Sequence, residues 1–151
     1  MSGSPPPDPR QRHAATLISD TKMYIFGGQW DDIPKNDLFS FDLAQNTWEA
    51  VAPTSGTLPP PRSGHTLVGV GEKLVLFGGT GADGKALGDL WEFDCAAATW
   101  KKCAVGGDDV AARHSHAAVV YNDVVYVYGG QDDSGRELTD LLCYSPASGT
   151  K

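Results

Sequence analysis

The stretch Met23-Tyr24-Ile25-Phe26-Gly27-Gly28 carries the pattern that decides the fold, because an apolar run of strand-forming residues ends there in two glycines. The same pattern recurs at residues 74–79 and 124–130. The Gly-Gly pairs begin at Gly27, Gly78 and Gly129, which are 51 residues apart each time. A fixed period of this length is the sequence signature of a repeat architecture. The chain is therefore built from three copies of one unit.

Other landmarks keep the same period. Each unit contains an Arg-x-x-His element, then an Asp-Leu pair, then an aromatic residue (Phe41, Phe93, Tyr144) three positions after the leucine. The Arg-x-x-His elements are Arg10/His13, Arg62/His65 and Arg113/His116, and the Asp-Leu pairs begin at Asp37, Asp89 and Asp140. A Thr-Trp pair closes two units at Trp48 and Trp100, whereas Lys151 stands at the corresponding position of the third. So many landmarks in register exclude a chance match.

These features resemble the kelch repeat over residues 10–151: an apolar strand before a double glycine, a spaced aromatic residue and then a tryptophan, at a period near 50. The resemblance implies a β-propeller in which each repeat forms a four-stranded antiparallel blade. We expect a flexible, Pro-rich segment at residues 1–9. Repeats are expected at 10–61, 62–112 and 113–151, the last truncated before its fourth strand.

The residues themselves also predict an all-β chain. In the segment 38–43, Leu38 and Ser40 alternate with Phe39 and Phe41, which is typical of a strand in a sheet with unlike faces. No segment of about ten or more residues shows helical periodicity. In an up-and-down blade, the connections between the second and third strands and between successive blades lie at one end. These connections are the long ones, at residues 29–36, 80–88, 131–139, 49–61 and 101–112. Long loops on a rigid scaffold commonly carry binding function, so we expect it at this end.

Composition limits the class of partner and the compartment. The chain has 12 Lys and Arg against 19 Asp and Glu, a formal net charge of −7, which argues against nucleic acid and anionic membranes as partners. No apolar run approaches the roughly 20 residues of a membrane helix. The three cysteines, Cys95, Cys103 and Cys143, do not form a disulfide pattern, which favours a reducing, cytoplasmic location.

Candidate protein-binding residues are polar or aromatic positions in or beside the long loops. They are Trp30, Asp31, Asp32, Lys35, Arg62, Arg113, His114, Asp132, Asp133 and Arg136. Trp30 is a candidate interface anchor, although packing on its own loop is an equal alternative. Resemblance to kelch propellers that bind acidic peptides implies a binding role for Arg62 and Arg113. Their strict period fits better with a structural role in which they bond loop carbonyls.

Catalytic chemistry finds little support in the residues. The one-per-repeat histidines His13, His65 and His116 favour a structural role over metal binding, and no cofactor motif is present. Some kelch propellers are oxidases, epimerases or specifier proteins, but their ligand sets cannot be placed here. We therefore predict a non-catalytic protein-interaction module without metal or cofactor. An enzymatic or ligand-binding propeller and an architectural subunit remain the alternatives.

Three blades leave the assembly open, since a propeller closes with about four to eight blades. The sequence fits a fragment of a longer propeller, a homodimer that forms a six-bladed ring, or an open array completed by another protein. Open arrays expose apolar blade faces and strand edges. We therefore expect a partner, a second copy or further blades to cover these surfaces.

Overall fold

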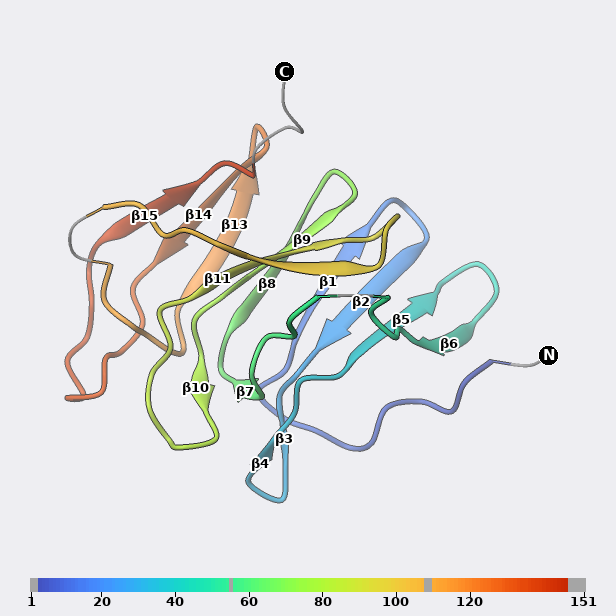
Figure 1. Ribbon diagram of the computed structural model, residues 1–151, viewed down its shortest axis with the longest axis horizontal. Helices are drawn as coiled ribbons and strands as arrows, with labels where there is room; N and C mark the ends of the chain where they lie inside the picture. Colours follow the sequence, from blue (N-terminus) through green and yellow to red (C-terminus); the bar gives the residue numbers. More distant parts are fainter. Residues whose placement is uncertain (1–2, 55, 108–109, 147–151) are drawn as a thin grey trace.

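The computed structural model describes residues 3–54, 56–107 and 110–146, and its described elements are all strands. Three antiparallel sheets follow one another along the chain (Figure 1). Sheet 1 consists of β1 (Ala14–Ile18), β2 (Lys22–Phe26), β5 (Leu38–Asp42) and β6 (Thr47–Ala50). Sheet 2 consists of β8 (Thr66–Val70), β9 (Lys73–Phe77), β11 (Leu90–Asp94) and β12 (Thr99–Cys103). Sheet 3 consists of β13 (Ala117–Tyr121), β14 (Val124–Tyr128) and β15 (Leu141–Tyr144).

Two short strand pairs lie within the long connections. They are β3 (Gln29–Trp30) with β4 (Ile33–Pro34), and β7 (Arg62–Ser63) with β10 (Thr80–Gly81). The all-β prediction is confirmed, and the order of strands within each sheet is the up-and-down order expected for a blade. The described residues contain no helix long and apolar enough to cross a lipid bilayer.

The hydrophobic core lies between the sheets rather than within one of them. Between sheets 1 and 2, Phe26 and Leu38 pack with Leu74, Leu76 and Phe93. Between sheets 2 and 3, a second cluster joins residues of β8, β9 and β11 to residues of β14. Each strand of sheet 2 thus points alternate side chains to the two neighbouring sheets, because successive side chains leave opposite faces of a strand. Sheet 2 is the only one of the three that is covered on both faces within the described residues.

The double glycines allow neighbouring sheets to approach closely. A Cβ on Gly27 would lie 2.8 Å from Cε1 of His65, and one on Gly78 would lie 2.7 Å from Cε1 of His116. Both glycines also have positive φ angles, of 61° and 66°, which residues with a Cβ atom rarely adopt. The first glycine of each of these pairs therefore makes room for the histidine of the following repeat.

The two tryptophans of the Thr-Trp pairs occupy different settings. Trp100 of β12 packs between Phe26 and Phe93, with ring centroids 5.1 and 5.0 Å away, and lies in the core between sheets 1 and 2. Trp48 of β6 packs on Phe41 at 4.8 Å and is half-buried on the opposite face of sheet 1. Trp100 thus fills the space between two sheets, while sheet 1 has no sheet before it to cover Trp48 in the described part of the chain.

The N-terminal segment has a defined position from residue 3 onward. The backbone nitrogen of Ser4 donates to the carbonyl oxygen of Trp48 at 2.8 Å, and the Ser4 hydroxyl accepts from the nitrogen of Ala50 at 3.3 Å. This short bridge lies against the outer edge of β6. Ser4 therefore contacts sheet 1, where we expected a flexible segment.

Candidate functional site

The long connections gather at one end of the sheets. In Figure 1, β3, β4, β7, β10 and the loop between β14 and β15 lie along the lower side of the molecule, opposite the short turns. We call this the long-loop end, and define it by residues 29–36, 80–88 and 131–139. The connection that follows β6, which we expected at this end, also reaches the opposite end, where Thr54 donates to the carbonyl oxygens of Ala97 and Ala98 in the turn between β11 and β12. The geometry of the residues at the long-loop end decides which of them a partner can reach.

Arg62 and Arg113 make structural contacts inside the molecule. Both side chains are fully buried. Arg62 donates to both carboxylate oxygens of Asp89, at 2.7 and 2.8 Å, and to the carbonyl oxygens of Gly78 and Pro60. Arg113 makes the same contacts with Asp140, Gly129 and Ala111. A planar guanidinium with its donors engaged in this way joins the start of the repeat to the first glycine of its Gly-Gly pair and to the aspartate of its Asp-Leu pair. We therefore leave both arginines out of the proposed binding face.

The same ion pairs shift the titration of their carboxylates. Burial raises the pKa of Asp89, but hydrogen bonds from Arg62 and Trp91 outweigh burial and hold the pKa below its usual value. The hydrogen bond from Arg113 lowers the pKa of Asp140. Both carboxylates therefore stay ionised at neutral pH, and each balances a buried cation.

The β3–β4 hairpin carries the largest exposed apolar side chains of the first long loop. Trp30 is opposite Ile33, and the two are 51% and 60% exposed. Between them Asp31 and Asp32 have φ angles of 51° and 59°, the conformation of a type I′ hairpin turn. The ammonium group of Lys35 lies 6.0 Å from the centre of the Trp30 ring, at the limit of a cation–π contact. An indole, an aliphatic side chain and a cation thus share one small projecting structure.

Hydrogen bonds hold this hairpin to the next repeat. The Ser63 hydroxyl donates to the side-chain oxygen of Gln29 at 2.8 Å, and the nitrogen of Arg62 donates to the carbonyl oxygen of Lys35 at 3.0 Å. The side-chain amide of Asn36 donates to the carbonyl oxygen of Pro59. The hairpin is therefore supported at its base by the connection after β6 and by the first residues of the following repeat, and only its tip projects.

The loop of the third repeat is closed by one carboxylate. Asp132 accepts hydrogen bonds from the backbone nitrogens of Ser134 and Arg136, from the Ser134 hydroxyl and from Nε of Arg136. The hydroxyl bond from Ser134 lowers the pKa of Asp132. The side chain of Asp132 is only 18% exposed, whereas that of Arg136 is 69% exposed. Asp132 therefore shapes the loop, and Arg136 is the residue that it presents.

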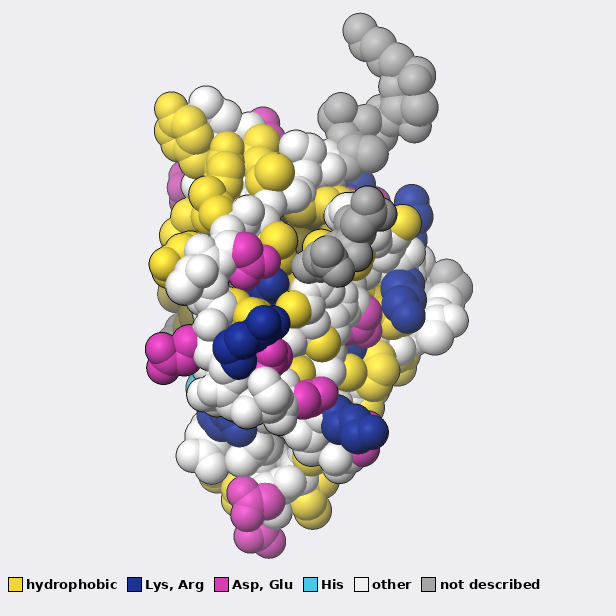
Figure 2. Space-filling view, turned by 90° about the vertical axis from the view of Figure 1, so that its left-hand side faces the viewer, with side chains coloured by type: hydrophobic (Ala, Val, Ile, Leu, Met, Phe, Trp, Pro, Cys, Tyr) yellow, Lys and Arg dark blue, Asp and Glu magenta, His cyan; other side chains and the backbone are white. Residues whose placement is uncertain are grey.

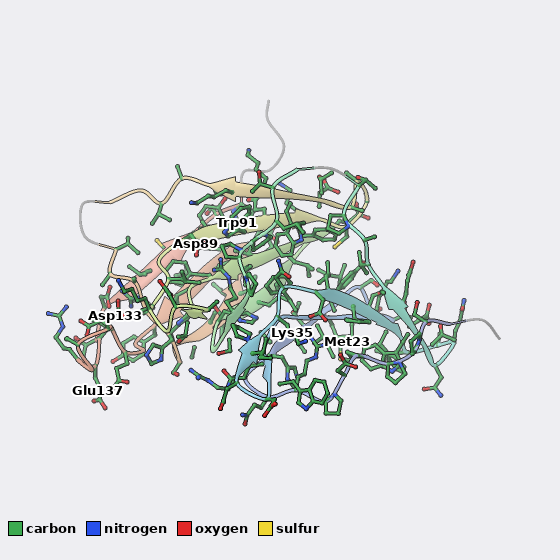
Figure 3. All side chains as sticks on the ribbon, turned by 60° about the horizontal axis from the view of Figure 1, so that its bottom comes forward. Met23, Lys35, Asp89, Trp91, Asp133 and Glu137 are labelled. Carbon is green, nitrogen blue, oxygen red and sulfur yellow. The ribbon has the colours of Figure 1, made fainter. Side chains whose placement is uncertain are left out.

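A second carboxylate joins two long loops. Asp133 accepts a hydrogen bond from the backbone nitrogen of Ala86 at 2.6 Å, which links the third loop to the second. Figure 3 shows Asp133 and Glu137 on the third loop and Lys35 at the base of the first. The second loop, at residues 80–88, comes between the first and the third loop in the chain. The long-loop end is thus a connected surface with acidic side chains from two repeats.

The histidines divide between structural and surface positions. His65 and His116 are buried and bond carbonyl oxygens of the preceding sheet. His114 is half-buried, pairs through its backbone with Gln131 and lies 3.0 Å from the Ser115 hydroxyl. Across the described ranges, no three His, Cys, Asp or Glu side chains gather closely enough to hold a metal ion.

The comparisons with known proteins give the family. The model of the KLHDC2/KLHL20/DRC7 kelch-repeats domain matches residues 1–150. The chain belongs to the kelch-repeat family. The three sheets are accordingly kelch blades 1, 2 and 3, and the resemblance seen in the glycine, arginine and histidine landmarks is confirmed.

Several curated proteins contain a related segment. Host cell factor 1 of Homo sapiens is 37% identical over 145 residues, which cover 83% of this chain and 7% of the human protein. Tip elongation aberrant protein 1 of Schizosaccharomyces pombe is 34% identical over 148 residues, or 93% of this chain and 13% of the yeast protein. The Rho GTPase-activating protein gacHH of Dictyostelium discoideum is 30% identical over 138 residues, or 88% of this chain and 9% of that protein. The chain therefore spans a small part of each relative.

Reasoning from the kelch pattern alone missed Ile33. It lies at a non-periodic position, and it is exposed only because the Asp31-Asp32 turn places it beside Trp30. A strand pair of two residues is too short for a clear alternation of polar and apolar residues. Two residues that tolerate positive φ angles, flanked by Trp and Ile, were the available signal.

Proposed function

We propose that this kelch chain is a non-catalytic protein-interaction module that binds its partner through the long-loop end. The proposed contact residues are exposed or half-buried there. They are Trp30, Asp31, Asp32, Ile33, Lys35, His114, Asp133 and Arg136, with Asp132 as the residue that shapes the third loop. Membership of the kelch-repeat family supports the interaction role in general, and the choice of surface and residues is our proposal.

The observation that carries the proposal is the exposed pair Trp30 and Ile33 on a supported hairpin. A large aromatic side chain that is exposed in the free protein and held at its base loses little conformational entropy on binding, which is the usual setting of an interface hot spot. Residues that make no contact with the hydrophobic core are the best candidates for recognition. Neither side chain belongs to a core cluster.

The charge of the long-loop end indicates the chemistry of the partner. Asp31 and Asp32 form the turn between Trp30 and Ile33, and Asp133 and Glu137 lie on the third loop of the same end. We propose a partner surface with an apolar pocket for Trp30 and basic residues around it. Complementary charge of this kind mainly raises the rate of association and its salt dependence.

The arginine and histidine sets support the non-catalytic part of the proposal. In the enzymatic alternative, these groups would converge on a substrate. Here Arg62, Arg113, His65 and His116 instead bond carboxylates or carbonyl oxygens of the blades. An architectural role through the blade faces remains the second alternative, because blade 3 has an exposed apolar face.

The compartment and the assembly are further parts of the proposal. Cys95, Cys103 and Cys143 are all free, which fits a reducing compartment such as the cytoplasm. We propose that a protein partner, further blades or a second copy covers the open faces of blades 1 and 3.

Quantitative affinity capture followed by mass spectrometry tests the proposed face. Trp30→Ala is compared with the wild type and with Leu43→Ala, a matched truncation of an exposed side chain in the turn between β5 and β6 at the opposite end. We expect a set of captured proteins whose affinity falls about 10- to 100-fold with Trp30→Ala and is unchanged with Leu43→Ala. Equal capture by all three proteins would reject the long-loop end as the binding face. Thermal unfolding of each variant checks that the fold is intact.

A further inference from the structure

Ser134 lies in the turn of the third long loop, at a position that is acidic in the other two repeats. Asp32, Asp83 and Ser134 are each the fourth residue after the second glycine of their Gly-Gly pair. All three are exposed, so the repeat that follows does not cover this position in repeats 1 and 2. The third repeat therefore presents an accessible hydroxyl where the other two present a carboxylate.

The Ser134 hydroxyl takes part in the hydrogen bonds that close the third loop. It donates to Oδ1 of Asp132 at 2.6 Å, and the backbone nitrogens of Ser134 and Arg136 donate to the same oxygen at 2.9 and 3.0 Å. Nε of Arg136 donates to the other carboxylate oxygen of Asp132 at 3.1 Å. The hydroxyl of Ser134 and the guanidinium of Arg136 thus share one carboxylate.

The residues around Ser134 fit the substrate groove of a protein kinase that selects acidic side chains after its serine, which we call an acid-directed kinase. Glu137 stands three residues after Ser134, and no other serine of the chain has Asp or Glu at this spacing. The side chain of Glu137 is exposed. Asp132 and Asp133 precede the serine. A kinase with a basic groove recognises such a segment through complementary charge.

We propose that Ser134 is a phosphorylation site for an acid-directed, ATP-dependent protein kinase, and that the phosphate draws Arg136 away from Asp132. In the transfer, the Ser134 oxygen attacks the γ-phosphorus of ATP. The bond between that phosphorus and the leaving oxygen of ADP breaks, and the hydroxyl proton passes to a base of the kinase. The products are phosphoserine and ADP.

Two effects of the phosphate act in the same direction. It removes the hydroxyl hydrogen that Asp132 accepts, and it places a charge of about −1.5 to −2 beside that carboxylate. Like charges repel at the 2.6 Å of the present hydrogen bond, so the phosphate and Asp132 move apart. Arg136 is 69% exposed and free to follow the phosphate, which offers it three oxygens and more charge than the carboxylate.

The phosphate also gives the third repeat the negative charge that Asp32 and Asp83 supply in the other two. The long-loop end thereby becomes more acidic, which favours the basic partner surface proposed above. Only this effect on a partner rests on the proposed function. The modification and the movement of Arg136 are measured on the chain alone.

Phosphorylation of the full chain by a purified acid-directed kinase, followed by mass spectrometry, tests the site. We expect one phosphate at Ser134 in the wild type and none in Ser134→Ala. Glu137→Gln should lower kcat/KM about tenfold or more, because it removes the charge that the kinase selects. Ser115→Ala is the matched control. It changes another exposed serine, which has Ala118 three residues after it, and should be phosphorylated like the wild type.

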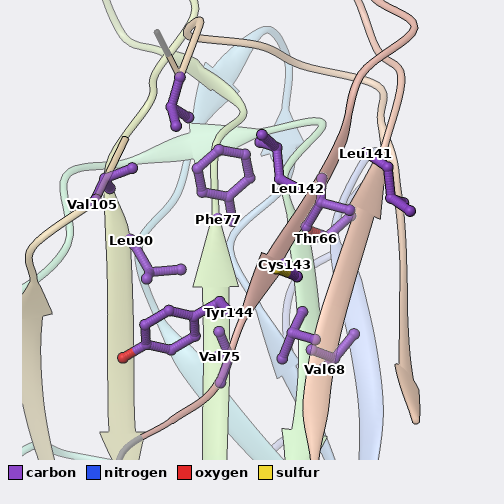
Figure 4. Close-up of a pocket in the computed structure, with 14 residues that line it drawn as sticks. Thr66, Val68, Val75, Phe77, Leu90, Val105, Leu141, Leu142, Cys143 and Tyr144 are labelled. Atoms are coloured by element: carbon purple, nitrogen blue, oxygen red, sulfur yellow. The ribbon is translucent and has the colours of Figure 1, made fainter. Parts of the chain in front are cut away.

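NMR of the phosphorylated chain tests the movement of Arg136. The phosphate should titrate at least about half a pH unit lower in the wild type than in Arg136→Gln, because a neighbouring guanidinium favours the doubly charged phosphate. Amide signals of residues 131–139 should shift on phosphorylation. Signals of Val75 and Phe77 should stay in place, since these residues line an apolar cavity whose walls come from blades 2 and 3 and the connection after β12 (Figure 4).

Three results would overturn the proposal. One is phosphate on other residues with Ser134 unmodified, and another is equal kcat/KM for the wild type and Glu137→Gln. The third is the same phosphate titration in the wild type and in Arg136→Gln, which would show that Arg136 stays on Asp132. None of these results bears on the proposed binding face, which Trp30→Ala tests separately.

Discussion

Nε2 of His116 lies 3.1 Å from the carbonyl oxygen of Phe77, so a side chain of blade 3 closes the end of a strand in blade 2. His65 makes the same contact with Phe26 of blade 1, at 3.0 Å. A carbonyl oxygen only accepts hydrogen bonds, so Nε2 carries the proton of each neutral ring. Nδ1 of both histidines is buried and has no partner. A second proton on either ring would therefore be buried without an acceptor.

The first prediction concerns stability in acid. Burial lowers the pKa of His65 to about 3 and that of His116 to about 4, from an ordinary value of 6.5. Protonation is therefore harder in the folded chain than in the unfolded chain, and these histidines favour unfolding increasingly as the pH falls below 6.5. We expect a loss on the order of 2 kcal/mol per histidine in the free energy of unfolding between pH 6.5 and pH 4. Urea titrations across this range measure the loss.

A double variant separates the histidines from the carboxylates. Acid also protonates Asp89, whose pKa lies below its usual value, and this too destabilises the fold. His65→Gln combined with His116→Gln should have lower stability at pH 7 but a flatter dependence on pH between 6.5 and 4. An unchanged slope in the double variant would show that these histidines do not control the acid response.

The second prediction compares two equivalent ion pairs. Arg62 and Arg113 are equally buried, but the side chain of Asp89 is 15% exposed and that of Asp140 is 43% exposed. Asp89→Asn should cost about 3–5 kcal/mol, because it leaves a buried guanidinium without its carboxylate. Asp140→Asn should cost clearly less, since water can reach the remaining guanidinium. Chemical unfolding of the two variants decides the order, and equal losses would contradict it.

The third prediction uses the first glycines of two Gly-Gly pairs. Gly78 and Gly129 have φ angles of 66° and 72°, so alanine costs about 1–2 kcal/mol at either position. At Gly78 the new Cβ would also lie 2.7 Å from the carbonyl oxygen of Arg113, whereas at Gly129 the nearest atom is 3.4 Å away. Gly78→Ala should therefore lower the melting temperature markedly more than Gly129→Ala. The reverse order would show that the approach of the next blade does not determine the choice of glycine.

The periodic landmarks predicted the fold because they are the contacts between blades. A double glycine, an arginine and a histidine recur at one spacing since each blade meets the next in the same way. The sequence also predicted that periodic arginines bond loop carbonyls, and Arg62 and Arg113 do so. It could not predict their carboxylate partners with certainty, because residues 27 positions apart meet only once a blade has formed.

The candidate site was less predictable from the sequence. From the sequence, Trp30 could equally have packed on its own loop. In the structure the turn at Asp31 and Asp32 directs it outward, and it is exposed. Asp132 and Arg136 had similar standing in the sequence, yet a set of local hydrogen bonds makes one a loop-shaping residue and the other a surface residue. Side-chain roles in loops depend on such local geometry, which a repeat pattern does not encode.

The fourth prediction concerns self-association. Blade 3 leaves apolar side chains exposed on the face away from blade 2, and Figure 2 shows hydrophobic side chains gathered on part of this side of the molecule. They include Val119, Tyr121, Tyr128 and Leu141. Because exposed apolar faces favour association, the mass by light scattering should rise above 16.0 kDa with increasing concentration.

Charge on that face should reverse the association. Val119→Lys combined with Tyr121→Lys places two ammonium groups on β13, and we expect the mass to return to that of a single chain. Leu43→Lys, on an exposed turn of blade 1, is the matched control and should not change the association. A mass of 16.0 kDa for the wild type at every concentration would contradict this prediction.

The most direct measurement of the proposed function is hydrogen–deuterium exchange of the chain with and without a purified protein that it captures. Binding through the long-loop end should slow exchange in residues 29–36 and 131–139, around Trp30 and Arg136. Exchange should stay unchanged in the short turns at the opposite end. Protection confined to β13 and β14, with the long loops exchanging as in the free chain, would contradict the proposal and favour an architectural role through the blade faces.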